Sequence, residues 1–270
     1  MNLHRRDFIK TALTASAAAT LANVGASAAA PSTSDGSDRE YYELRAYRLK
    51  PNALPSLLDG YLEKALIPAL NARGIQNVGV FTEPESKDGT AVWVLIAHPS
   101  LASVTAVTAE LNADPKVQSA AVDYLSGPGP KNPAFERIDS WLLLAFAGLP
   151  KLTVPGFARA KQARIFELRT YESFSELTAL KKVDMFNAGE IGVMQDVGLS
   201  PVFFGQALIG RDLPHLTYML SSTDRETLAK SWSAFGKHPG WVKLKNDPQY
   251  ADTVSKITSR MFMPTSYSQL

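Results

Sequence analysis

The sequence Tyr-Glu-Leu-Arg-Ala-Tyr at residues 42–47 returns as Phe-Glu-Leu-Arg-Thr-Tyr at residues 166–171, which is 124 positions further on. The same displacement aligns a glycine, a strand valine, three positions at helical spacing and a proline: it carries Gly74, Val78, Val104, Thr108, Leu111 and Pro115 onto Gly198, Val202, Leu228, Trp232, Phe235 and Pro239. A single displacement without gaps that aligns a strand, a helix, a glycine and a proline indicates a tandem repeat. We call the two units the first and the second copy.

Each copy is predicted to contain four strands and two main helices. In the first copy, the alternation and the runs of apolar residues favour strands at residues 42–47, 78–81, 91–97 and 137–147. Helices are expected at residues 53–73 and 101–111, and Asp114-Pro115 is typical of an N-cap followed by proline at the first position of a further short helix. The second copy repeats this order and ends with a strand at residues 256–263.

The order β-α-β-β-α-β is the split βαβ, or ferredoxin-like, unit, in which both helices cover one face of an antiparallel sheet. Residues 91–97 are apolar on both faces of their strand, so the face without helices also needs a cover. We therefore predict an α+β fold in which the two sheets close on each other within one chain, as an intrachain dimeric α+β barrel. The expected divisions are a first repeat at 40–147, a linker at 148–163 and a second repeat at 164–270.

The amino-terminus has the order of an export signal. Arg5-Arg6 is followed by Asp-Phe-Ile-Lys, an Ala-rich apolar run and the small residues Ala26-Ser27-Ala28. This order resembles a twin-arginine signal peptide cleaved after Ala28, and it predicts a periplasmic or secreted protein that has no membrane segment after cleavage. The apolar run is shorter than the ~20 residues that a membrane-spanning helix needs.

The composition excludes several classes of function. Removing residues 1–28 deletes three of the 28 Lys and Arg residues and one of the 26 Asp and Glu residues, which leaves 25 of each. A neutral chain of this kind argues against nucleic-acid binding, which needs clustered cations. The absence of cysteine excludes disulfides, thiolate metal sites and cysteine nucleophiles.

Three stretches together resemble a known family. They are the Tyr/Phe-Glu-Leu-Arg-x-Tyr opening of each copy, the run from Ser231-Trp232 to His238-Pro239-Gly240-Trp241, and the closing Met263-Pro264-Thr265-Ser266-Tyr267-Ser268. These motifs are similar to the NIPSNAP family, and the resemblance covers the mature chain. It implies a dimeric α+β barrel, a superfamily that includes small monooxygenases and some haem enzymes. It implies no agreed set of catalytic residues.

The polar side chains of the first strand in each copy are the main site candidates. Residues two apart on a strand share a face, so Glu43, Arg45 and Tyr47 lie together if Leu44 packs against the helices. The expected cavity between the sheets is then lined by Glu43, Arg45, Tyr47, Trp93, Glu167, Arg169 and Tyr171. The other interpretation of the Glu and Arg side chains is a paired network that fixes how the copies dock, since buried charges need partners.

No metal site is predicted, because no paired His or carboxylate ligands occur at metal-binding spacing. No cofactor is expected either. Haem held by His98 or His215 is a weaker alternative, since a lone histidine at a strand end is usually structural.

We expect a binding protein that holds a small hydrophobic or aromatic ligand between its sheets. A non-enzymatic interaction module with a filled barrel is the alternative, and a cofactor-free monooxygenase-like enzyme is a further one. Whether the chain is an enzyme, and whether it forms a homo-oligomer, is left open. An open pocket of ~300 Å³ or more favours ligand binding over a filled interior.

Overall fold

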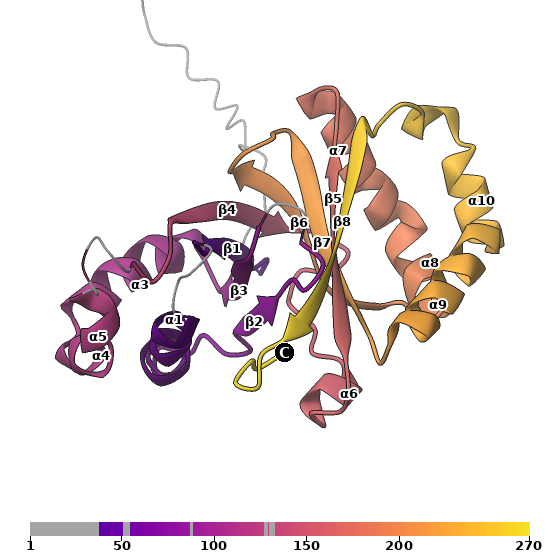
Figure 1. Ribbon diagram of the computed structural model, residues 1–270. Helices are drawn as coiled ribbons and strands as arrows, with labels where there is room; N and C mark the ends of the chain where they lie inside the picture. Colours follow the sequence, from indigo (N-terminus) through magenta and orange to yellow (C-terminus); the bar gives the residue numbers. More distant parts are fainter. Residues whose placement is uncertain (1–37, 51–54, 87–88, 127–128, 130–132) are drawn as a thin grey trace, which may run out of the picture. The chain divides into compact units, whose positions relative to one another are not determined.

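The computed structural model describes residues 38–50, 55–86, 89–126, 129 and 133–270 (Figure 1). The expected signal at residues 1–28 lies outside them. The first copy comprises β1 (Tyr41–Arg48), α1 (Pro55–Tyr61), η1 (Leu62–Leu66), α2 (Ile67–Ala72), β2 (Gly79–Thr82), β3 (Ala91–His98), α3 (Leu101–Ala113), α4 (Pro115–Ala120), α5 (Val122–Leu125) and β4 (Arg137–Ala145). The short helix α6 (Gly156–Arg159) lies between the copies.

The second copy repeats the same order. It comprises β5 (Ile165–Glu172), α7 (Glu176–Met185), η2 (Phe186–Glu190), α8 (Ile191–Asp196), β6 (Ser200–Ile209), β7 (His215–Ser222), α9 (Arg225–Lys237), α10 (Pro239–Lys245), η3 (Pro248–Tyr250) and β8 (Lys256–Pro264). The segments η1 and η2 are π-helical turns and stand 124 residues apart, so even this local irregularity recurs. The predicted tandem repeat is confirmed.

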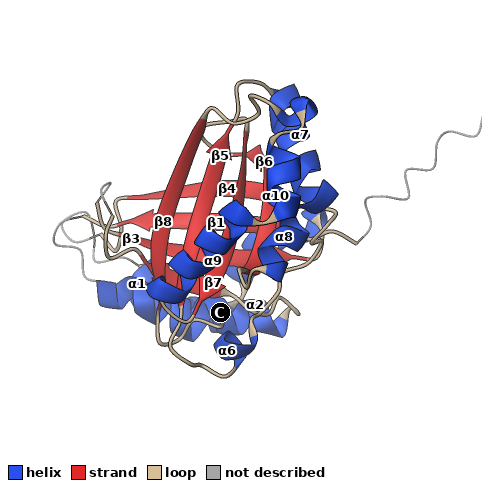
Figure 2. Ribbon diagram, turned by 90° about the vertical axis from the view of Figure 1, so that its right-hand side faces the viewer, coloured by secondary structure: helices blue, strands red, loops and turns tan. Residues whose placement is uncertain are grey.

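The eight strands form one closed antiparallel barrel in the order β1-β3-β2-β8-β5-β7-β6-β4 (Figure 2). Within each copy the strand order is that of the ferredoxin-like unit, with the first strand between the third and the fourth. The two sheets join edge to edge, where β2 pairs with β8 and β4 pairs with β6. Each of the eight described strands therefore has a neighbour on both sides, and the predicted intrachain barrel is confirmed.

Strand β3 shows why the barrel closes. Val92, Val94 and Ile96 pack into a cluster with the helices of the first copy. Trp93, Leu95 and Ala97 point the other way and pack inside the barrel with residues of both copies. Every residue of β3 is buried. As the sequence predicted, neither face of this strand is left in water.

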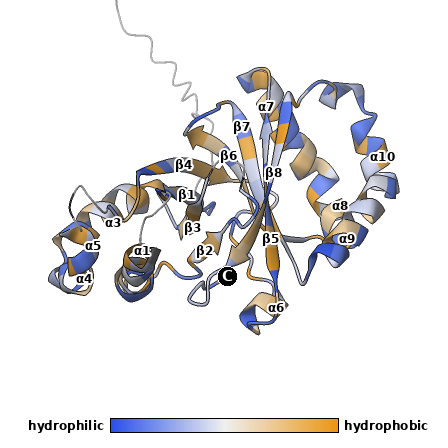
Figure 3. Ribbon diagram, in the orientation of Figure 1, coloured by the Kyte–Doolittle hydropathy of each residue, from blue (hydrophilic) through white to orange (hydrophobic). Residues whose placement is uncertain are grey.

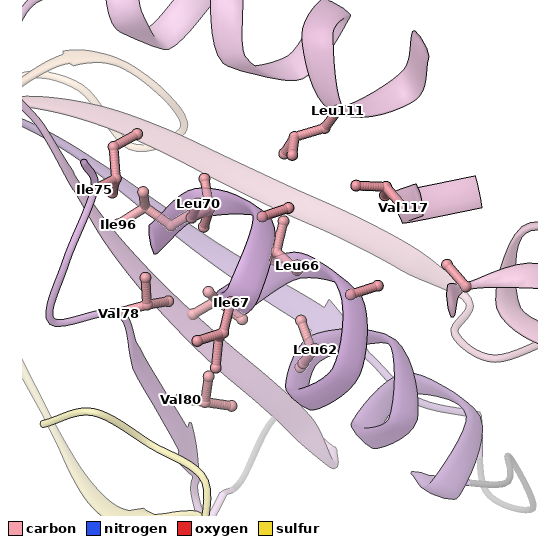
Figure 4. Close-up of a cluster of buried hydrophobic side chains, with 14 of the residues drawn as sticks. Leu62, Leu66, Ile67, Leu70, Ile75, Val78, Val80, Ile96, Leu111 and Val117 are labelled. Carbon is pink, nitrogen blue, oxygen red and sulfur yellow. The ribbon is translucent and has the colours of Figure 1, made fainter. Parts of the chain in front are cut away.

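Helices cover the outer face of the barrel on two sides. The first-copy helices lie on one side of the strands and the second-copy helices lie on the other (Figure 1). Many of the strand residues between them are hydrophobic (Figure 3). In the first copy, Ile67 lies beside Val80 and Leu70 lies beside Ile96, and Leu62 and Leu66 extend this apolar stripe along the helix (Figure 4). Burying a leucine side chain contributes ~1.5–3 kcal/mol, so this stripe anchors the helix.

Local signals in the sequence place the turns. Gly74 and Gly198 end the first helix of each copy with φ of 81° and 78°, in the left-handed region that glycine adopts without strain. The Asp114 side chain accepts a hydrogen bond from the Lys116 amide at 2.9 Å and caps α4, as expected from Asp114-Pro115.

The barrel interior is filled at the end where β1 and β5 begin. Phe166 lies opposite Phe262 in the register of β5 and β8, and the ring of Phe81 lies 4.9 Å from that of Phe166. Leu270 packs into the same apolar cluster, and Tyr42 contacts Phe203 at a ring distance of 4.8 Å. The space within the barrel therefore lies toward the opposite end, where β1 and β5 finish.

Candidate functional site

A cavity of about 580 Å³ opens at the end of the barrel where β1 and β5 finish. It lies between the two copies, and Leu44 and Leu168 from the equivalent first strands both face it. Its lining comes from alternate, inward-pointing positions of six strands and from the loop between β6 and β7: Leu44, Arg48, Trp93, Arg137, Trp141, Leu168, Thr170, Glu172, Arg211, Asp212, His215, Thr217, Lys256, Thr258 and Arg260.

The first-copy wall is aromatic. Trp93 of β3 and Trp141 of β4 stack with ring centroids 5.8 Å apart and an interplanar angle of 17°. The Trp93 indole N–H donates to Glu83 Oε2 at 3.2 Å, which satisfies the polar atom of a side chain that is 5% exposed. Trp93 is thus held in one orientation, and the pair presents apolar surface to the cavity.

The second-copy wall contributes a cluster of hydroxyl groups and one histidine. Thr170 Oγ1 lies 2.9 Å from Thr217 Oγ1, which in turn lies 3.2 Å from His215 Nδ1. Burial lowers the pKa of His215 below its usual 6.5, because the charged imidazolium loses hydration. The imidazole is therefore neutral at neutral pH and can accept or donate a hydrogen bond.

Charged side chains ring the mouth. Five lining residues are Arg or Lys and two are acidic, so the lining is cationic. Most of the cations have carboxylate partners. Lys256 Nζ lies 2.8 Å from Glu172 Oε1, and Arg260 Nη1 lies 2.9 Å from Glu83 Oε1.

The remaining three cations are arginines, and two of them share one acid. Arg48 and Arg211 share the buried Asp139, with Arg211 Nη1 3.4 Å from Asp139 Oδ1. Arg137 is exposed at the mouth and has no ion-pair partner among the residues that the structure describes.

The first-strand polar groups face the opposite way from our expectation. Leu44 points into the barrel, so Glu43, Arg45 and Tyr47 lie on the outer face beneath the first-copy helices. Arg45 Nε and Nη2 donate to the two carboxylate oxygens of Glu43 at 2.6 and 2.9 Å. Burial opposes the ionisation of Glu43, but hydrogen bonds from His98 and Arg45 outweigh it and lower its pKa to about 2. These three residues do not line the cavity.

The second copy corrects the expectation in the same way. Glu167 accepts hydrogen bonds from Arg169 Nη1 at 2.7 Å, from Trp232 Nε1 at 2.7 Å and from Ser259 Oγ at 2.6 Å. Tyr171 Oη lies 2.8 Å from Tyr218 Oη, also beneath the helices. Glu167 faces the helices because its hydrogen-bond donor, the Trp232 indole N–H, lies on that side of the strand. The Glu and Arg groups pair within each copy on its outer face, so they do not link the two copies as the alternative interpretation expected.

The two histidine candidates differ in their surroundings. Both ring nitrogens of His98 have hydrogen-bond partners, Nδ1 with Ser103 Oγ at 3.2 Å and Nε2 with Glu43 Oε2 at 3.4 Å, and His98 does not line the cavity. His215 lines the cavity. Of the sequence candidates, Trp93 and His215 are therefore the two that the fold brings to the cavity.

Sequence reasoning missed most of the charged lining, namely Arg48, Arg137, Arg211, Lys256 and Arg260. A signal was present for Arg48, because residues 44, 46 and 48 share a strand face and Leu44 is apolar. Arg48 was not predicted, because the polar residues Glu43, Arg45 and Tyr47 were expected to face the interior. Arg211 comes from a loop and had no signal of this kind.

Family comparison matches the chain over residues 42–127 and again over residues 166–269, one match for each copy, to the model described as NIPSNAP. The chain belongs to the NIPSNAP family. Both copies carry the family pattern, so this NIPSNAP chain encloses its cavity between two family units of one polypeptide. No curated protein sequence matches it.

Solved structures share the fold of this NIPSNAP chain. A candidate monooxygenase from Fusobacterium nucleatum superposes with a TM-score of 0.55 at 8% identity, covering 84% of this chain and 93% of the other. A candidate monooxygenase from Lactobacillus acidophilus gives 0.53 at 7% identity, with 84% and 94% covered. A NIPSNAP-like domain protein from Burkholderia xenovorans gives 0.36 at 18% identity, covering 40% of this chain and 90% of that protein. At such identities the first two show a common fold.

No helix within the described part of the chain has the length and apolar character needed to cross a bilayer.

Proposed function

We propose that this NIPSNAP protein binds a small aromatic or otherwise apolar ligand in the open end of its barrel. The observation that carries the proposal is the cavity of about 580 Å³ between the copies. Ligand sites in proteins typically occupy ~300–1,000 Å³, and the opposite end of the same interior is packed with aromatic rings. An interaction module with a filled barrel would have no such cavity, so that alternative is less well supported.

The chemistry of the walls favours a ligand that is apolar on one side and polar on the other. The stacked Trp93 and Trp141 provide a flat apolar surface. Across the cavity, Thr170, Thr217 and Thr258 provide hydroxyl groups that can donate or accept hydrogen bonds. Ligand sites are commonly built in this way, with an apolar lining and a few placed polar groups.

The proposal is tested by filling the cavity. Thr217 occupies the position in the second copy that Trp93 occupies in the first, since each pairs with the equivalent residue of its first strand. We expect Thr217→Trp to abolish binding of N-phenyl-1-naphthylamine, a neutral fluorescent probe, while wild type binds it. Thr108→Trp, the same exchange at an exposed position of α3, is the matched control and keeps binding. Equal probe binding by all three folded proteins would contradict the proposal.

The natural ligand can be sought directly. Protein purified from its native compartment is analysed by native mass spectrometry, and we expect a bound mass in wild type that is absent from Thr217→Trp. A clean apo mass in both, together with no probe binding, would favour the interaction module.

A cofactor-free oxygenase-like reaction is the second candidate, and His215 is the observation in its favour. A neutral imidazole inside the cavity can accept a proton from a bound ligand. Oxygen uptake on adding the recovered ligand, lost in His215→Gln, would support it. Ligand binding without oxygen uptake would contradict the oxygenase-like reaction and support a binding function alone.

We also propose that the chain is exported through the twin-arginine route, on the strength of Arg5-Arg6 and the small residues that precede Pro31. Replacing both arginines with lysine should retain the protein in the cytoplasm, as measured by cell fractionation. Unchanged export of that variant would refute the route.

A further inference from the structure

The two copies differ in charge at equivalent positions of the cavity mouth. In the second copy, Glu172 at the end of β5 lies opposite Lys256 of β8, and the two form an ion pair at 2.8 Å. In the first copy, the equivalent register position places Arg48 of β1 opposite Arg137 of β4. The second-copy pair is therefore electrically neutral, whereas the first-copy pair places two guanidinium groups on neighbouring strands.

Like charges directly opposite each other in a sheet are destabilising. Asp139, two residues along β4 from Arg137, accepts from Arg48 and lies 3.4 Å from Arg211. Its single negative charge is thus already shared between two cations. Arg137 lines the cavity with no ion-pair partner among the described residues. This side of the mouth therefore holds the guanidinium groups of Arg48 and Arg137 from the first copy and of Arg211 from the second, with Asp139 as their one carboxylate.

We propose that the ligand carries a carboxylate group, which binds at Arg137 beside Arg48 while an aromatic body lies in the cavity. The inference rests on the proposed binding function and specifies the chemical class of its ligand. An arginine fork matches the planar, two-oxygen geometry of a carboxylate, and charge-assisted hydrogen bonds of this type are among the stronger ones.

The position of the arginines fits a ligand with two unlike ends. Arg137, Asp139 and Trp141 alternate along one face of β4, so they run from the mouth into the barrel. A molecule that places its carboxylate at Arg137 directs its apolar body toward Trp141 and Trp93. The self-neutralised pair on the second-copy wall provides no comparable free cation.

The test compares two probes of the same shape. 2-Naphthoate carries a carboxylate, and 2-naphthamide replaces it with a neutral amide. We measure dissociation constants by isothermal titration calorimetry for wild type, Arg137→Met and Lys230→Met. Lys230 is an exposed cation on α9, so its variant controls for the loss of one net charge. Arg137 is itself exposed, so its replacement leaves the core untouched.

We expect wild type to bind 2-naphthoate at least about tenfold more tightly than 2-naphthamide, since an arginine pairs with the charge and the two oxygens of a carboxylate, which the neutral amide lacks. Arg137→Met should lose this preference, and Lys230→Met should keep it. Equal affinity of wild type for the two probes, or a preference that survives Arg137→Met, would overturn the carboxylate inference while the binding proposal stands. Failure of both probes and of N-phenyl-1-naphthylamine to bind would overturn the two proposals together.

Discussion

Lys182 Nζ lies 2.7 Å from Glu190 Oε2 inside the second copy, where the first copy has Leu58 and Leu66. Both charged side chains are almost fully buried, with 4% and 2% exposure, and so are the two leucines. Lys182 also faces aromatic rings, with Nζ 4.8 Å from the centroid of Phe186 and 5.4 Å from that of Trp241. One helix pattern therefore carries an ion pair in one copy and an apolar pair in the other.

This relationship gives the first prediction. Removing one partner of a buried ion pair typically costs ~3–5 kcal/mol, whereas replacing both with apolar residues is often neutral or stabilising. We expect Lys182→Leu and Glu190→Leu each to lower the free energy of unfolding by ~3–5 kcal/mol, and the double variant to remain within about 1 kcal/mol of wild type or to exceed it. Urea unfolding measures all four proteins. Additive losses in the double variant would show that the two side chains are not energetically coupled, which would contradict the prediction.

Acid stability tests the Glu43 network. The pKa of Glu43 falls from 4.5 to about 2 on folding, so its ionised form stabilises the fold above pH 4.5, and this contribution is lost as the pH falls toward 2. The shift corresponds to about 3 kcal/mol. Wild type should lose its advantage over Glu43→Gln progressively between pH 5 and pH 2, as measured by urea unfolding. A pH-independent difference between the two proteins would be inconsistent with a lowered pKa.

His215 gives a prediction of the opposite kind. Burial lowers its pKa, so the folded protein holds the neutral form while the unfolded chain binds a proton below pH 6.5. Stability that is present above pH 6.5 is therefore lost as the pH falls below this value. We expect the stability of wild type relative to His215→Gln to decrease between pH 7 and pH 5 in thermal unfolding. A difference that grows as the pH falls would mean that the folded state favours the imidazolium.

The fold could be predicted from the sequence because its decisive signals are local or repeated. Residues 91–97 are apolar on both faces of a strand, which required a second sheet as cover, and Trp93 falls inside the barrel as a result. The repeat supplied that sheet from the same chain. Gly74 predicted the end of its helix and Asp114 predicted the N-cap of α4, each from the local sequence alone.

The orientation of the first strands could not be obtained in this way. Both faces of β1 and β5 are largely covered, so alternation alone did not decide whether Leu44 or Glu43 points inward. Hydrogen bonding decides it, because partners such as Trp232 and Ser259 lie on the helix side of Glu167. These partners are far away in the sequence. Because Glu43 and Glu167 face the helices, the cavity is lined by other charged residues, including Arg48 and Arg137.

The open end of the barrel is the place where the ligand is proposed to bind. The four tryptophans provide an internal comparison, because Trp93 and Trp141 line the cavity whereas Trp232 and Trp241 pack with the helices of the second copy. We would titrate labelled protein with 2-naphthoate and follow the four indole N–H resonances by NMR. We expect saturable shifts at Trp93 and Trp141 and unchanged resonances at Trp232 and Trp241. Shifts confined to Trp232 and Trp241, or no saturable shift at all, would contradict the account.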